Sequence, residues 1–193
     1  MPEPTALARR IAAVAQAQHD RFRFVNEADP ELCAQIRKWT QEIGFPFQSC
    51  TAVPWAPQFV SWCVKKAGAT RADFEFSMAT SVFTHSAIRK AESGATGFRG
   101  FDPAAHAPHV GDIIVHNRGG GSHDFAFART HRNYKSHPVI VVEVGQDADG
   151  AYAFCVGGNE GDSVRQTTVR LGPDGLLLPR EESPFICVIH PPG

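Results

Sequence analysis

The apolar pattern of the chain changes once, near Val110, and this change limits the possible folds more than any other feature. Upstream of it, apolar residues recur at helical spacing, which predicts helices at 5–18, 30–43, 57–67 and 77–92. Downstream, turns separate short β-rich runs at 112–116, 138–144, 152–156, 163–171 and 185–190. Helices followed by strands are typical of an α+β domain. We therefore expect the helices to pack on an antiparallel sheet of about five to six strands.

Length and composition indicate one packed domain. The chain has 193 residues, of which 42% are hydrophobic and 20% are charged. We expect a single domain over 1–193, with a helical N-terminal extension at 1–45 and a core at 46–193. The net charge is −1 and no basic run occurs, so we expect neither a nucleic acid nor an anionic membrane as partner.

The sequence also bears on location. No apolar run approaches about 18 residues, so no membrane insertion is expected. The apolar stretch after Arg10 is soon interrupted by Gln16 and Gln18, so we expect synthesis in the cytoplasm without a Sec signal.

The five cysteines are odd in number, and none of their spacings is typical of a zinc knuckle or a redox motif. Cys63, Cys155 and Cys187 lie in apolar runs, which predicts buried, reduced thiols. This pattern favours folding in a reducing compartment.

One segment carries a recognisable motif. Residues 54–68 read PWAPQFVSWCVKKAG. They resemble the helix that bears the nucleophile in the NlpC/CHAP superfamily of papain-like cysteine hydrolases, where the pattern is Trp-Cys-x-x-Phe-Val-x-Trp followed by an Ala-Gly stop. Matching the Phe-Val and Ala-Gly pairs places the nucleophile at position 56, which is an alanine. The resemblance covers residues 50–170 in fragments and implies a papain-like fold.

The position suits a nucleophile for a general reason. With Pro57 as the predicted first helical residue, residue 56 lies at the helix cap. Unpaired N–H groups and the helix dipole lower the pKa of a thiol there, and the same groups can hold an oxyanion. Ala56 cannot attack a carbonyl. Either a cysteine, or less readily a serine, has been replaced to inactivate the enzyme, or the chain is a natural pseudoenzyme.

The resemblance also implies a general base and an orienting group. Gly111-Asp112 begins one strand, and His137 begins the next, as in the superfamily's His-Val-x-Ile-Val pattern, from which Pro138 departs. His137 is the expected base, although a surface histidine at a strand start is the simpler reading. The run 155–164, CVGGNEGDSV, resembles the superfamily's Gly-Gly-Asn turn. Asn159 is the first choice as orienting group and Glu160 the second, although Asn159 would also be ordinary in a turn.

Three residues are expected to contact a substrate: Trp55, Glu160 and His85. Trp55 either lines the groove or packs in the core, whereas Trp62 is expected in the core. His85 precedes the strands, so it is expected to be structural or to line the groove.

Several further polar residues suggest a zinc site: His106, His109, His116, His123, His131 and Asp124. Histidine and carboxylate ligands can leave one coordination position open for water. However, no His-Glu-x-x-His motif occurs, and these residues would lie on a flexible loop. We therefore expect no metal and no other cofactor.

The resemblance implies a cysteine hydrolase that cuts amide bonds in peptidoglycan stem peptides, as an amidase or endopeptidase. Delivered as an antibacterial effector or lysin, it would act in the periplasm or cell wall of a target bacterium, and an immunity protein is a possible partner. Two alternatives stay open: a papain-like protease toxin with a protein target, and a non-catalytic peptide-binding pseudoenzyme.

Overall fold

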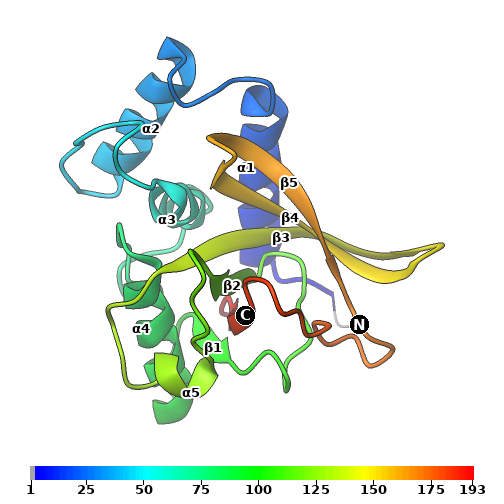
Figure 1. The fold of residues 1–193 in the computed structure, drawn as a ribbon. Helices are drawn as coiled ribbons and strands as arrows, with labels where there is room; N and C mark the ends of the chain where they lie inside the picture. The colour runs from blue at the N-terminus through cyan, green and yellow to red at the C-terminus, as the bar shows by residue number, and fades with distance from the viewer. Residues whose placement is uncertain (1–2) are drawn as a thin grey trace.

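A computed structural model describes residues 3–193 (Figure 1). Its helices are α1 (Ala6–Phe22), α2 (Pro30–Glu42), α3 (Ala56–Lys66), α4 (Thr80–Ser93) and α5 (Phe125–Ala128). Its strands are β1 (Arg99–Phe101), β2 (Ile113–Asn117), β3 (Ser136–Asp147), β4 (Gly150–Glu160), β5 (Ser163–Arg170) and β6 (Phe185–His190). The α+β class is confirmed, since all six strands form one antiparallel sheet in the order β1-β6-β2-β3-β4-β5.

The predicted elements agree with the observed ones apart from their ends. All four predicted helices form, and the five predicted runs become β2 to β6. α3 begins at Ala56, one residue before the predicted start, and α4 begins at Thr80 rather than at 77, because the Ser77 hydroxyl accepts a hydrogen bond from Ala79 N and holds a turn there. The three-residue strand β1 and the one-turn helix α5 are too short to give a periodic signal.

The two faces of the sheet are covered differently. Side chains from α1 to α4 pack with Ile113, Val115, Ile140 and Val156 on one face. The alternate residues on the same strands point to the other face, where Ile114, Val139 and Cys155 pack with the segment after β5, which contributes Leu171 and Leu177. The helices therefore occupy one side of the sheet, and the long β3–β4 hairpin extends away from α2, α3 and α4 (Figure 1).

The expected N-terminal extension contributes to this main core. Ile11 and Phe22 of α1 and Trp39 of α2 are fully buried in the cluster that also contains α3. The Ser163 hydroxyl at the start of β5 donates to the carbonyl of Phe22 at 3.0 Å. α1 and α2 thus help to fix the position of α3 on the sheet.

A disulfide joins Cys33 of α2 to Cys50 in the segment before α3. The three other cysteines are free and buried, which confirms the prediction for Cys63, Cys155 and Cys187. Because disulfides form and persist in oxidising compartments, this bond corrects the inference of a reducing compartment, which had left these two cysteines unpaired. Within residues 3–193, no helix is long and apolar enough to cross a membrane.

Candidate functional site

The site lies at the end of the sheet where α3 begins. Trp55 is the N-cap residue of α3 and Ala56 its first helical residue, and both are buried, with Ala56 only 1% exposed. α3 packs on β3 and β4. At Gly158 a Cβ atom would lie 2.6 Å from the Trp55 ring and 2.7 Å from Phe59 Cβ, so only glycine allows this close approach of α3 to β4.

A buried carboxylate connects α3 to the end of β4. Glu27 Oε2 accepts hydrogen bonds from Trp55 Nε1 at 2.7 Å and from Asn159 Nδ2 at 3.0 Å. Asn159 adopts a left-handed backbone conformation with φ 59°, in a register shift of the β4–β5 pair. Asn159 therefore holds Glu27, and the structure does not bring it to His137. Trp55 is fully buried, so its indole supports the site from within the core rather than lining a surface.

Glu160, which was predicted as the second candidate for the orienting group, lies beside His137. His137 Nε2 lies 2.9 Å from Glu160 Oε1, and His137 is 5% exposed. The ring nitrogen lacks the alignment of a good hydrogen bond, although it is close to the carboxylate oxygen. It lowers the pKa of Glu160 below its ordinary value, against the opposing effect of burial, and keeps this carboxylate ionised.

A second histidine belongs to the same cluster. His116 of β2 is the cross-strand partner of His137, and their ring centroids are 5.1 Å apart. Burial, followed by the neighbouring His137, lowers the pKa of His116 to about 4, so this ring is neutral at pH 7. His116 Nδ1 lies 2.9 Å from the carbonyl of Asn117 and donates to it, which leaves Nε2 with a free lone pair. This place of His116 beside His137 was not predicted, although it follows from the register of β2 with β3.

The cluster opens to a surface cavity of about 340 Å³. His116 and Glu160 line it together with Thr168 of β5 and Arg180 from the segment before β6. The Arg180 guanidinium brings a positive charge to this cavity, close enough to Glu160 and His116 to affect their pKa values. Glu182 also lines the cavity, so its charges are of both signs, and Arg180 is the group that could pair with a ligand carboxylate.

Residue 56 and His137 lie at the same end of the sheet but on different faces of it. β3 and β4 pair only from Ile140 and Val156 onward, so the strand ends that carry His137 and Glu160 diverge. Ile140 faces the helices, and strand alternation turns Val139 and His137 to the other face. The His137–Glu160 contact joins the divergent ends of β3 and β4. α3 begins at the same end of the sheet, on the opposite face.

The remaining predicted residues lie elsewhere. His85 of α4 has its Nδ1 3.1 Å from the carbonyl of Ala128 in α5, so it ties the two helices together rather than joining His137. His123 and His131 both stack on Phe127, and Asp124 caps α5 by accepting from Phe127 N at 2.8 Å.

The free thiols cannot replace a nucleophile at position 56. Cys63, Cys155 and Cys187 are all fully buried, and burial raises the pKa of each well above its ordinary value. Thiolate is the reactive form of cysteine, so these three side chains are inert.

Two groups of side chains have the composition of metal sites. In each group the ligand atoms all lie within 4.8 Å of one another: His116, His137 and Glu160 in the first, and His106, His109, Asp112 and His190 in the second. Of the residues considered for a zinc site from the sequence, His116 lies in the first group, His106 and His109 lie in the second, and His123, His131 and Asp124 lie in neither.

Comparison with known proteins gives one match. No curated protein and no solved structure matches the chain. The model of one family, described as uncharacterized proteins conserved in bacteria (DUF2272), matches residues 26–186. This span contains the candidate site from Glu27 to Arg180, and it begins after α1. The chain therefore belongs to the DUF2272 family.

Proposed function

We propose that this chain is a papain-like amide hydrolase scaffold that acts on the stem peptides of peptidoglycan, with its nucleophile position at residue 56. The observation that carries the proposal is the buried contact of 2.9 Å between His137 and Glu160, at the end of the sheet where α3 begins. A buried imidazole beside an ionised carboxylate is the base-and-orienter pair that an activated nucleophile needs.

The proposed roles follow from chemistry. A thiol at position 56 would meet the unpaired N–H groups of the first turn of α3, which favour the thiolate and can hold the oxyanion. Because residue 56 and His137 lie on different faces of the sheet, the His137 ring would have to turn between the divergent ends of β3 and β4 to accept the thiol proton and return it to the leaving amine. Glu160 would hold the imidazole in position and stabilise its protonated form. The Arg180 side chain would attract a carboxylate of the substrate, a group that peptide stems carry.

The chain as it stands has Ala56 and is expected to bind such a peptide without cutting it. In this form it is either a natural pseudoenzyme or an inactivated enzyme. The Cys33–Cys50 disulfide suits action in an oxidising periplasm or cell wall. An immunity protein that covers the cavity beside His116 and Glu160 is compatible with the proposed effector role.

The test restores the nucleophile. The Ala56→Cys variant should release soluble fragments from purified peptidoglycan, which mass spectrometry of the digest would identify together with the bond cut. His137→Ala in that background should abolish release. His85→Ala should leave it unchanged, because His85 lies on α4 against α5. An inert Ala56→Cys variant would remove the peptidoglycan hydrolase proposal, whereas cleavage of protein substrates alone would favour a protease toxin.

One observation favours a second function. His116, His137 and Glu160 form a two-histidine, one-carboxylate set beside a surface cavity, and the free Nε2 of His116 is suited to a metal. A divalent metal held there would activate water, so Ala56 would not need to be replaced. Zinc-dependent hydrolysis by the unmodified chain, lost in His116→Gln, would establish this function in place of the first.

A further inference from the structure

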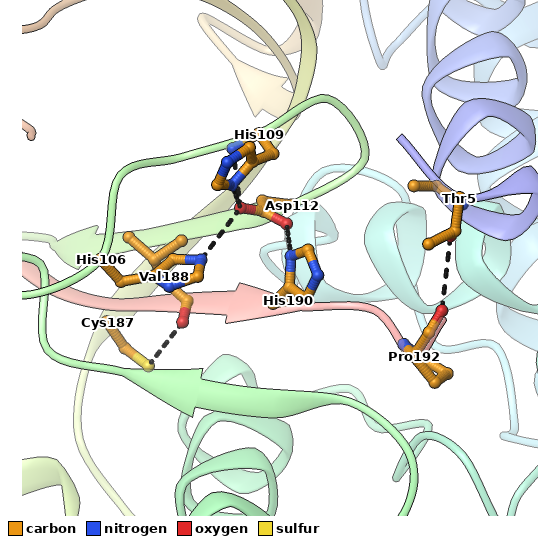
Figure 2. A network of polar contacts seen from close by, with 9 residues as sticks. Thr5, His106, His109, Asp112, Cys187, Val188, His190 and Pro192 are labelled. Carbon is orange, nitrogen blue, oxygen red and sulfur yellow. Dashed lines mark hydrogen bonds and ion pairs between the residues drawn. The ribbon is translucent and has the colours of Figure 1, made fainter. Parts of the chain in front are cut away.

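A second polar cluster lies away from the proposed active site. His106 and His109 belong to the loop between β1 and β2, Asp112 precedes β2, and His190 ends β6 (Figure 2). Asp112 and His116 are four residues apart along an extended segment, so their Cα atoms are about 13 Å apart. Nothing in the proposed mechanism uses the cluster at Asp112.

The four side chains converge on the Asp112 carboxylate. Asp112 is completely buried, and its Oδ1 lies 2.7 Å from His190 Nδ1. Its Oδ2 lies 3.7 Å from His106 Nε2 and 3.8 Å from His109 Nδ1. Figure 2 shows the three imidazole rings directed at this carboxylate, two from the β1–β2 loop and one from the end of β6.

Two of the imidazole nitrogens have no partner. His106 Nε2 and His109 Nδ1 are buried, and no hydrogen bond reaches either of them from the described part of the chain. Separations of 3.7 and 3.8 Å from Oδ2 are too long for hydrogen bonds. Buried polar atoms are nearly always paired, so two orphaned nitrogens aimed at one carboxylate require an explanation.

His190 Nδ1 is hydrogen-bonded to Asp112 Oδ1 at 2.7 Å, a contact that would lengthen on metal binding, whereas the separations of 3.7 and 3.8 Å at His106 and His109 suit atoms that share a metal ion. Zinc bonds of 2.0–2.1 Å in a tetrahedral site place neighbouring ligand atoms about 3.3–3.4 Å apart. The ligand atoms of this cluster already lie within 4.8 Å of one another, so small side-chain rotations would close the site. Three imidazoles and one carboxylate match the nitrogen and oxygen ligands that zinc accepts.

Supporting contacts hold two of the ligands in place. The His106 ring stacks on Phe101 of β1, with centroids 4.5 Å apart and an interplanar angle of 13°. Asp112 Oδ2 accepts a hydrogen bond from the backbone N of His109 at 2.8 Å, which ties the loop to the start of β2. Such second contacts fix the orientation of metal ligands.

We propose that His106, His109, Asp112 and His190 bind one zinc ion in a closed, four-ligand structural site. The ion would join the β1–β2 loop to the last residue of β6 and so secure the C-terminal strand in the sheet. Since imidazoles bind metal in the neutral form, uptake would release any proton that the cluster holds. The histidine side chains are 20–37% exposed, which leaves the ion a path from solvent.

The test compares zinc binding by the wild-type chain and by His106→Gln/His109→Gln. These residues lie on a surface loop, so the double variant should fold, which far-UV circular dichroism would check; Asp112 is left intact because it is buried. The matched control is His123→Gln/His131→Gln, which removes two histidines that stack on Phe127 instead. Zinc per chain would be measured by mass spectrometry after dialysis against buffered zinc, and affinity by competition with a chromophoric chelator.

The wild-type chain and the control should each bind one zinc more than the double variant. Loss of even outer contacts weakens metal sites by about 10–100-fold, so loss of two ligands should weaken this site by more than about 100-fold. Cobalt bound to the wild-type chain should show intense tetrahedral absorption bands that the double variant lacks. The double variant keeps His116, His137 and Glu160, so zinc bound by that group would be the same in all three proteins. The difference in zinc content between the wild type and the double variant therefore measures the Asp112 site alone. A double variant that binds as much zinc as the wild type, or a wild-type chain that binds none, would overturn the proposal.

Discussion

The pKa of a cysteine introduced at position 56 tests most directly whether this position pairs with His137. In Ala56→Cys, the new thiol would lie in the first turn of α3, behind the divergent strand ends that carry His137 and Glu160. An ordinary thiol has a pKa of about 8.5, and helix N-termini or a neighbouring imidazolium lower it to about 3.5–7.5. Burial of position 56 would raise the thiol pKa, but we expect the helix N-terminus and His137 to outweigh it and to bring the pKa below about 7.5 in this variant.

The assay follows the rate of iodoacetamide alkylation against pH by intact-protein mass spectrometry. The background is low, because the three free cysteines are buried with raised pKa values and the other two are bonded to each other. Adding His137→Ala should raise the pKa of the introduced thiol by at least about one unit, equivalent to about 1.4 kcal/mol. His85→Ala should leave it unchanged. A pKa that does not respond to His137→Ala would refute the pairing of position 56 with this imidazole.

Three further predictions concern the fold. Replacing Cys33 and Cys50 by serine should lower stability by about 3 kcal/mol, since the bond closes a loop with a sequence separation of 17, and the melting temperature should fall by about 6–12 °C in calorimetry. Gly158→Ala should cost about 1–3 kcal/mol in urea unfolding because its Cβ would clash with Trp55, whereas Gly193→Ala, with open space around it, should cost nothing. In EDTA, stability should rise with pH between about 4 and 6.5, by about 3 kcal/mol in all, because the folded pKa of His116 is about 4 and the unfolded chain binds the proton more tightly. His116→Asn should flatten this rise, and an unchanged pH slope would count against the buried neutral ring.

The helices and strands could be predicted where apolar residues recur at a regular spacing in the sequence. The amphipathic stripe of α2 and the alternating runs of β2 to β6 identify the class, and all of them form. The sheet order could not be read in the same way, because β6 enters between β1 and β2 through contacts that are distant in sequence. The Cys33–Cys50 bond was missed for a related reason, since the path of the chain between α2 and α3 decides whether the two thiols meet.

The sequence motif predicted which segments form the candidate site. It did not predict which side chains of those segments contact one another. The resemblance indicated a helix start at residue 56, an imidazole at 137 and a polar turn at 159–160. The left-handed backbone at Asn159 decides which of the two turn residues meets His137, and it sends Asn159 to Glu27 and Glu160 to the imidazole. The sequence did not predict that Asp112 and His190, the proposed metal ligands, lie together, because their proximity depends on the pairing of β2 with β6.

The position of β6 has a consequence for biosynthesis. β6 lies between β1 and β2 although it follows all the other strands in sequence, so the sheet cannot close until β6 has left the ribosome. Until then β2 has one unpaired edge and β1 has no partner, and the nascent polypeptide should stay open to chaperones and to translocation machinery that threads unfolded chains. Deletion of Phe185–His190 would remove an interior strand of the sheet and should leave a product that proteases degrade.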